Sequence, residues 1–449
     1  MRSDPMNEYI SNTHHASRHT GEYVTRTLHP VTITDLRASR ILDSRGYPTV
    51  RVHLTLTDGT TVTGDAPAGA STGAHEAVEL RDGGDAYAGR DVSQALLMTA
   101  AEVAPLITGR SWVSITELDA ALAALDGTAG YSRLGANTVV ATSIAMSRAF
   151  AAAAGLPLWR WIADVTGSTP RLPVPHFNVL NGGAHAANAL DFQEFMIAPV
   201  SATSMVDAVR VGSDVYHALS GIVRERFGAV GLGDEGGFAP AITSPEEALD
   251  LLVDAIRISG HDAGVNAMAI ALDPAANEFA LGDGTYRIVD QHLDRDGLVA
   301  YYERLVGTYP IRSIEDSFSE DDHAGWKAMN TALGSRLQIV GDDLYVTDPQ
   351  RIRDGGRDGL SNAALIKPNQ IGTVSQTLDA IRTARELGMR SMVSHRSGET
   401  TDAFIADLVV GTGTGQIKSG APARGERVAK YNRLTEIEET AHDLPYGLA

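Results

Sequence analysis

Residues 363–395 read AALIKPNQIGTVSQTLDAIRTARELGMRSMVSH. Two short apolar runs, Ala363–Ile366 and Ser391–Ser394, enclose an amphipathic segment, Val374–Leu387. Apolar runs that alternate with amphipathic helical segments are typical of a parallel sheet with crossover helices. The stretch therefore predicts one strand–helix–strand unit of an α/β fold.

The same unit recurs on both sides of this stretch. The further runs are Ala267–Leu272, Ile311–Ile314, Leu337–Val340 and Thr414–Ile417. An ionisable residue follows each of the six runs: Asp273, Glu315, Asp342, Lys367, His395 and Lys418. In a β/α barrel the C-terminal strand ends share one rim, and active sites form there. Polar residues also commonly end strands, but three acids followed by three bases favour a site.

The N-terminal third has a different pattern. Short strands are predicted at Ala38–Asp43, Thr49–Thr57 and Thr61–Ala66, with Asp58-Gly59 as a hairpin turn. Helical patterns follow at Val92–Ile107, Ser114–Leu125 and Asn137–Ala154. We predict an extension over residues 1–30, an α+β cap domain over residues 31–168 and a barrel over residues 169–449.

Composition excludes several classes of protein. The chain has 449 residues, and its charge is 37 − 56 = −19. Such an acidic chain is a poor candidate for binding nucleic acid or an anionic membrane, but a phosphorylated substrate remains possible at a locally basic or metal-bearing site. The absence of cysteine excludes disulfides, thiolate metal sites and cysteine nucleophiles. With no secretory signal in the polar N-terminus and no apolar run near ~20 residues, we expect a cytoplasmic protein.

The three rim acids suit a divalent cation. Asp273, Glu315 and Asp342 offer hard oxygen ligands, which Mg²⁺ prefers. A set of salt-bridged carboxylates is the alternative, ranked second. Lys367 and Lys418 are the cations of the same rim. A lysine near other cations and partly desolvated has a lowered pKa and can act as a base, although an ion pair is the simpler reading of either one alone.

Other residues suggest further parts of a site. Arg396-Ser397 combines a guanidinium fork with a hydroxyl, a good grip for phosphate. The tight loop Gly233–Gly237 can present Glu235 as an acid, a weak signal when taken alone. Two small-residue loops, Ala68–Gly73 and Asn181–His185, are suited to act as lids.

At this point the residues resemble those of the enolase family. The similarity runs from about Ile41 to about Glu438 and is strongest at four segments: Ser394-His395-Arg396-Ser397-Gly398-Glu399-Thr400, Gly415-Gln416-Ile417-Lys418, Gly233-Asp234-Glu235-Gly236-Gly237 and Gln193-Glu194-Phe195-Met196. Together these segments are very specific.

The resemblance implies a cap domain on a modified (β/α)8 barrel whose first units run ββαα. It implies an enolase-type carbon–oxygen lyase that uses two Mg²⁺ per active site. The reaction would be the reversible dehydration of 2-phosphoglycerate to phosphoenolpyruvate, through C2 proton abstraction and a metal-stabilised aci-carboxylate. It also implies a homodimer or higher homo-oligomer.

The resemblance assigns roles residue by residue. Lys367 would be the base, and Glu235 the acid with Glu194 beside it. Asp273, Glu315 and Asp342 would hold the first metal, and Ser71 would help to hold the second. The remaining assignments are His395 near the leaving group, Lys418 and Gln193 at the substrate carboxylate, Arg396 and Ser397 at the phosphate, and His185 on a closing loop.

Several positions depart from the family pattern. Ala68, Ser317 and Pro368 lie one to three residues from implied site residues, and Tyr47 lies further away. They leave a second hypothesis open: an actinobacterial paralogue that forms carboxyphosphonoenolpyruvate from a phosphonoformyl donor. A non-catalytic binding or structural role ranks third, since such a protein has no need to keep Lys367 and Glu235.

Overall fold

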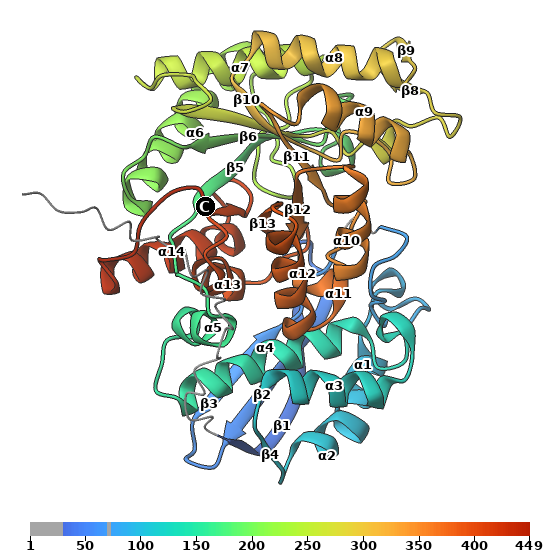
Figure 1. The fold of residues 1–449 in the computed structure, drawn as a ribbon, viewed down its shortest axis with the longest axis vertical. Coiled ribbons are helices and arrows are strands. Elements are labelled where there is room, and N and C mark those ends of the chain that lie inside the picture. The colour runs from blue at the N-terminus through green and yellow to red at the C-terminus, as the bar shows by residue number, and fades with distance from the viewer. Residues whose placement is uncertain (1–29, 70–72) are drawn as a thin grey trace, which may run out of the picture.

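The computed structural model describes residues 30–69 and 73–449. Two predictions therefore lie outside the described residues: residues 1–29 of the extension, and Ser71 as a metal ligand. In Figure 1 a small sheet with its helices forms one end of the molecule, and a barrel surrounded by helices forms the rest. The predicted fold class is confirmed.

The cap sheet is antiparallel throughout, in the order β3-β2-β1-β4. Its strands are β1 (Val31–Leu42), β2 (Pro48–Leu56), β3 (Thr61–Asp65) and β4 (Ser111–Trp112). The predicted turn joins β2 to β3: Gly59 has φ +87°, a conformation that glycine adopts without strain, and the Asp58 carboxylate accepts from the Thr60 N–H at 2.8 Å. β1 begins earlier than predicted, because Val31 and Ile33 are buried in the cap core.

The cap helices pack around this sheet. They are α1 (Ser93–Met98), α2 (Ala104–Ile107), α3 (Ile115–Asp126), α4 (Ala136–Ala153) and α5 (Leu158–Thr166). Helix α4 lies against β2 and β3, and α5 packs on α4 and on the barrel helix α13 (Phe404–Thr412). The single helix predicted over Val92–Ile107 is interrupted by a π-helical turn, Thr99–Val103, just before Pro105. Proline lacks an N–H and crowds the preceding turn, and a wider turn accommodates it. Helix α5 was not predicted.

The barrel is closed by eight strands. They are β5 (Val174–Asn181), β6 (Glu194–Pro199), β7 (Met268–Asp273), β10 (Ile311–Glu315), β11 (Gln338–Gly341), β12 (Ala363–Ile366), β13 (Arg390–Ser394) and β14 (Gln416–Lys418). All neighbours are parallel except β6, which is antiparallel to β5 and β7. A loop without a crossover helix joins β5 to β6, so the chain must reverse there. The ββαα start implied by the resemblance is present.

Most of the barrel helices among the described residues begin where a side chain satisfies a free N–H group. They are α6 (Met205–Phe227), α7 (Pro245–Ile258), α8 (Arg295–Thr308), α9 (His323–Leu333), α10 (Pro349–Asp358), α11 (Pro368–Ile371), α12 (Val374–Glu386), α13 (Phe404–Thr412) and α14 (Gly425–Thr440). Side-chain caps start six of them: Ser204, Ser244, Asp294, Asp322, Asp348 and Thr373. A short hairpin, β8 (Tyr286–Ile288) and β9 (Gln291–Leu293), precedes α8.

The cap domain is bonded to the barrel by polar contacts. Two N–H groups at the start of α12 donate to cap side chains: Val374 to the Ser143 hydroxyl and Ser375 to the Asp119 carboxylate, each at 2.9 Å. Arg148 of α4 forms a two-pronged ion pair with Asp402, at 2.6 and 2.7 Å. These contacts hold the cap against the C-terminal rim of the barrel.

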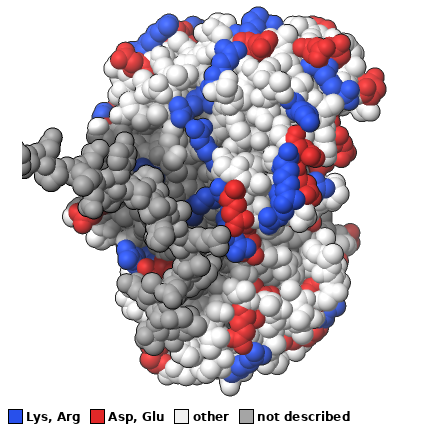
Figure 2. Space-filling model, viewed as in Figure 1, with Lys and Arg blue, Asp and Glu red and all other residues white. Residues whose placement is uncertain are grey.

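Figure 2 shows positive and negative side chains interspersed over the visible face. Among residues 30–69 and 73–449, no single helix has the length and hydropathy to cross a membrane. The pair α4–α5 meets that test of length and composition only when joined across a 94° bend.

Two glycines of α6 provide a matched test of packing. A Cβ on Gly212 would lie 2.4 Å from Cε2 of Phe177 in β5, whereas Gly221 has no heavy atom within 4 Å of a Cβ. We expect Gly212→Ala to destabilise the fold by about 1–3 kcal/mol through overpacking. Gly221→Ala should stabilise it by about 0.5–1 kcal/mol through helix propensity. Urea unfolding monitored by circular dichroism measures both, and equal midpoints would contradict the packing argument.

Candidate active site

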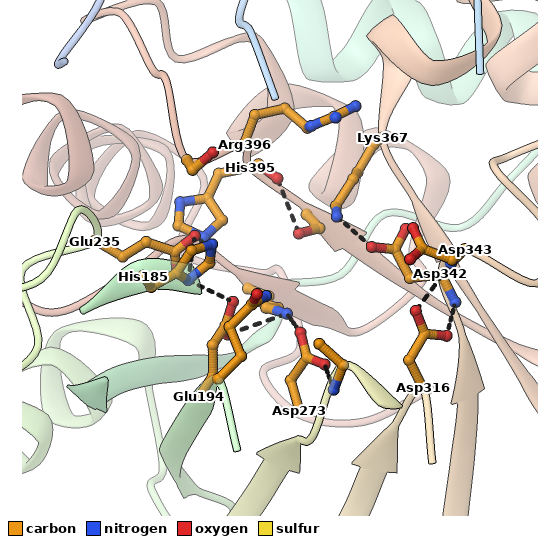
Figure 3. Close-up of a pocket in the computed structure, with 15 residues that line it drawn as sticks. His185, Glu194, Glu235, Asp273, Asp316, Asp342, Asp343, Lys367, His395 and Arg396 are labelled. Carbon is orange, nitrogen blue, oxygen red and sulfur yellow. Dashed lines mark hydrogen bonds and ion pairs between the residues drawn. The ribbon is translucent and has the colours of Figure 1, made fainter. Parts of the chain in front are cut away.

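One pocket lies at the C-terminal ends of the barrel strands, below the cap. Described residues that line it include His185, Gln193, Glu194, Glu235, Asp273, Asp316, Asp342, Asp343, Lys367, His395, Arg396, Ser397 and Lys418. Figure 3 shows two groups of side chains on opposite sides: His185, Glu194 and Glu235 on one, and Lys367, Asp342, Asp343 and Asp316 on the other. The strand ends thus bring together residues up to 233 positions apart, from His185 to Lys418.

Lys418, at the end of β14, occupies the centre of the acidic side chains. Its Nζ lies 2.8 Å from Glu315 Oε1, 2.9 Å from Asp273 Oδ2 and 3.0 Å from Glu194 Oε2. Burial disfavours its charge, but the three carboxylates outweigh burial and hold the pKa of Lys418 well above its ordinary value. Burial and the charge of Asp273 likewise raise the pKa of Glu315 well above its ordinary value.

Lys367 lies across the pocket and pairs with the Asp342 carboxylate. The other oxygen of Asp342 accepts from Gln370 at 2.9 Å. Lys367 has extended backbone, φ −125° and ψ 106°, and Pro368 is the first residue of α11, where its missing N–H is not needed. The departure at Pro368 therefore suits the end of the strand.

The electrostatics of Lys367 match the ion pair that was the simpler reading of this lysine taken alone. Burial acts to lower its pKa, but the Asp342 carboxylate outweighs burial, and the pKa of Lys367 is raised from its ordinary value. In this arrangement Lys367 is an ammonium group, so it acts as a base only when Asp342 is engaged elsewhere.

Two pocket acids were not predicted. Asp316, directly after β10, accepts from the backbone N–H groups of Asp342 and Asp343, at 2.8 and 3.0 Å, and Asp343 accepts from Asn277 at 2.9 Å. Burial raises the pKa of Asp343 to about 7, with the Asp342 charge acting in the same direction. The signal was present in the sequence, since each of these acids directly follows a predicted one.

The carboxylates fit a divalent cation. Two sets of ligand atoms among the described residues lie within 4.8 Å of one another: His185, Glu194 and Glu235, and Asp316, Asp342 and Asp343. The metal ligands predicted from the sequence, Asp273, Glu315 and Asp342, form neither of these two sets. In the structure Lys418 pairs with Asp273 and Glu315, and Lys367 pairs with Asp342. Buried carboxylates neutralised only by lysine present the oxygen donors that Mg²⁺ takes, so the residues fit such an ion.

Glu235 projects from the glycine-rich loop between α6 and α7. A Cβ on Gly237 or Gly233 would lie 2.4 or 2.7 Å from Asn181 Oδ1, which explains why the loop needs glycine. The Glu235 Oε2 atom accepts from Asn178 at 2.9 Å and lies 3.1 Å from His395 Nε2. Its Oε1 atom lies 3.7 Å from His185 Nδ1, which is also 3.6 Å from Glu194 Oε1.

The pKa values of Glu194 and Glu235, the two carboxyls on this side of the pocket, are shifted in opposite directions. Burial, with the charge of Glu235, raises the pKa of Glu194 well above its ordinary value. Burial acts on Glu235 too, but His395 and His185 outweigh it and hold the pKa of Glu235 well below its ordinary value. The role of Glu235 as the acid, with Glu194 beside it, stays a prediction.

Arg396 follows β13 and is buried beneath the cap. Its guanidinium binds the Glu76 carboxylate, at 2.8 and 3.2 Å, and Asn369 Oδ1 at 3.1 Å. Glu76 comes from the cap, three residues after Gly73 at the end of the small-residue loop predicted as a lid. The group predicted to bind phosphate is therefore occupied by a carboxylate of the protein itself.

Comparison with known protein families identifies the family to which this chain belongs. A family model described as "Enolase, C-terminal TIM barrel domain" matches residues 169–446, and one described as "Enolase, N-terminal domain" matches residues 33–162. The chain belongs to the enolase family. The resemblance inferred from the sequence is confirmed, and the pocket is that of an enolase-family enzyme, with lyase-type chemistry and groups that can bind a metal.

The enolase fold brings in residues that sequence patterns did not indicate. Glu76 and Asn178 contact implied site residues, yet neither lies at a strand end among charged neighbours in the sequence. Arg427, on α14, contacts His395 and lies 32 residues from it in the sequence. Only the fold of the enolase barrel reveals these contacts.

Substitution of Glu76 tests whether its carboxylate competes with phosphate for the guanidinium of Arg396. Glu76→Gln removes the carboxylate from Arg396, so we expect the affinity for inorganic phosphate to rise by about 5-fold or more, because a nearby negative charge is lost. Isothermal titration calorimetry measures this change. Glu79→Gln is the matched control, since Glu79 pairs with Arg81 and should change the affinity less. Equal affinities in wild type and Glu76→Gln would contradict the competition.

Proposed function

We propose that the chain catalyses the reversible dehydration of 2-phosphoglycerate to phosphoenolpyruvate as a Mg²⁺-dependent lyase. The observation that carries this proposal is the position of Lys367 and of the Glu194–Glu235 pair on opposite sides of one pocket. A substrate between them has a base at one carbon and an acid at the next. Arg396 lies on the same rim and supplies a guanidinium for a phosphate group.

In the proposed reaction Lys367 removes the proton from C2 of the substrate. The electron pair left at C2 forms the C2=C3 double bond as the C3–O bond breaks. The departing hydroxyl takes the proton of the Glu235–Glu194 pair and leaves as water. Lys418 and Gln193 orient the substrate carboxylate, Arg396 and Ser397 hold the phosphate, and His185 and His395 bound the leaving-group side.

The metal requirement follows from the buried carboxylates. Asp273, Glu315 and Asp342 would hold one Mg²⁺, and Ser71 would contribute to the second. When bound, Mg²⁺ offsets negative charge that develops at the substrate carboxylate, worth several kcal/mol. Asp342, once it held the ion, would no longer keep the pKa of Lys367 raised.

The phosphonate alternative is supported by the departures beside the site. Ser317 is fully buried with no hydrogen-bond partner for its hydroxyl, and Ala68 pairs its backbone with Gly398, next to Ser397. Ser317 lies two residues after Glu315, and Gly398 directly follows Ser397, which is predicted to bind phosphate. A substrate with a phosphonoformyl group would meet the same base and the same cations.

A steady-state assay decides between these proposals. Purified chain with Mg²⁺ and 2-phosphoglycerate is followed by the ultraviolet absorbance of phosphoenolpyruvate. Turnover within the usual enzyme range of about 1–1000 per second supports the proposed dehydration. Turnover far below that range, with a phosphonoformyl substrate converted efficiently, supports the alternative. No metal-dependent activity on either substrate would leave the non-catalytic role.

The base assignment has its own test. Lys367→Ala should slow loss of deuterium from C2-labelled 2-phosphoglycerate by about 10²–10⁴-fold, the usual contribution of a general base. Mg²⁺ binding should persist. Lys327→Ala, at an exposed position of α9, is the matched control and should exchange at the wild-type rate. Wild-type exchange in Lys367→Ala would remove this residue from the role of base.

Metal binding is tested at Asp342. Asp342→Asn should weaken Mg²⁺ affinity by at least about 10-fold, the loss that follows even from removing an outer partner of a metal ligand. Calorimetric titration of the metal-free protein with Mg²⁺ gives the value. Asp354→Asn, at an exposed position of α10, should leave the affinity unchanged. An unchanged affinity in Asp342→Asn would exclude this carboxylate from the ligand set.

A further inference from the structure

Arg427 is a fully buried cation that the proposed mechanism does not use. It lies in the first turn of α14, with none of its surface exposed to solvent. Its guanidinium donates to His395 Nδ1 and to the carbonyl oxygens of Arg396 and Ser397, each at 2.6 Å, and to the carbonyl oxygen of Asp234 at 3.1 Å. One side chain thus joins the loop that carries Glu235 to the loop that carries the predicted phosphate grip.

The contact with His395 determines the tautomer of that histidine. A guanidinium has N–H donors and no acceptor, so Nδ1 of His395 must present its lone pair. Burial lowers the pKa of His395 to about 4, so the ring is neutral near pH 7. The single ring proton is therefore on Nε2, which lies 3.1 Å from Glu235 Oε2.

The consequence for Glu235 concerns its two oxygens. Oε2 accepts from Asn178 Nδ2 at 2.9 Å and lies 3.1 Å from His395 Nε2, although that approach does not have hydrogen-bond geometry. A proton on this oxygen would be directed at the amide donor and at the positive end of the Nε2–H dipole, which disfavours it. A proton on Glu235 is then favoured on Oε1, the oxygen on the side of His185 and Glu194.

We infer that Arg427 is a positioning residue that fixes the Nε2–H tautomer of His395 and so reserves Oε1 of Glu235 for the proton given to the leaving group. This inference rests on the proposed dehydration and deepens it. Among the described residues, the groups that face Glu235 are His395 of the β13–α13 loop, His185 and Glu194 of the β5–β6 region, Asn178 of β5, Lys418 of β14, and Arg427 and Tyr431 of α14.

The step that depends on Arg427 comes after proton removal at C2. As the C3–O bond breaks, its electron pair leaves with oxygen, which takes the proton from Glu235 Oε1 to form water. The C2 electron pair forms the double bond, and Glu235 is left as a carboxylate. Removal of the C2 proton by Lys367, across the pocket, does not require Arg427.

This separation of steps provides the first experiment. Arg427→Lys keeps the charge, but one ammonium cannot bind His395 and both loops at once. We expect its turnover to fall on the order of 10²-fold, the lower end of a general-acid contribution, while deuterium loss from C2 of 2-phosphoglycerate stays within about 3-fold of wild type. Arg433→Lys is the matched control on the same helix, where Arg433 pairs with Asp407, and should match wild type in both assays.

Equal losses of exchange and turnover in Arg427→Lys would overturn the inference, and so would unchanged turnover. Wild-type protein that neither exchanges nor dehydrates 2-phosphoglycerate would instead refute the proposed function. The two failures are therefore distinguishable.

A second experiment does not depend on the folding of Arg427→Lys. Nitrogen NMR of wild-type protein labelled with ¹⁵N-histidine, with the signals of His395 assigned by their absence in His395→Gln, reports which ring nitrogen carries the proton. We expect Nε2 protonated and Nδ1 unprotonated across the pH range of activity. A protonated Nδ1, or an imidazolium near pH 7, would overturn the inference even if Arg427→Lys does not fold.

Discussion

The ammonium group of Lys418, buried among Glu194, Asp273 and Glu315, is the interaction on which the site depends. Isolated carboxylates at such a depth would be strongly destabilising, and removal of one partner from a buried pair typically costs about 3–5 kcal/mol. The closed barrel makes the arrangement possible, because β14 closes onto β5 and brings its last residue across from β7 and β10. Closure of the barrel therefore sets both the pairing of the buried charges and the geometry of the site.

The same principle organises both sides of the pocket. Lys367 pairs with Asp342 on one side, while two carboxyls, two histidines and a buried arginine meet on the other. Asp342 holds the pKa of Lys367 above its ordinary value, and burial with the charge of Glu235 raises the pKa of Glu194. A cation or substrate that engages these carboxylates would therefore change the charge state on both sides of the pocket. Arg396 behaves likewise, with Glu76 in place of an external anion.

Much of the fold was readable from local patterns. The six predicted runs correspond to barrel strands, with small differences at their ends: the last strand is Gln416–Lys418, because Gly415 before it has φ +77°. Hydrophobic periodicity and turn residues are local properties of a sequence. The Asp58-Gly59 turn and the alternation of apolar runs with amphipathic segments around Lys367 therefore predicted the structure correctly. The π-helical turn before Pro105 and helix α5 were missed, because their geometry depends on packing in the cap core.

The sequence by itself determined the α/β class, the family and the identity of the rim residues, because strand ends and family segments are local features of the chain. The tertiary structure alone decided which charges meet: Lys418 with three acids, Glu76 with Arg396, and Arg427 with His395. The pairings join residues 32 to 320 positions apart, and the closure of the barrel under the cap sets them. The pKa shifts of the site residues were also decided by the tertiary structure. Burial and neighbouring charges cause these shifts, and the spacing of residues in the sequence predicts neither.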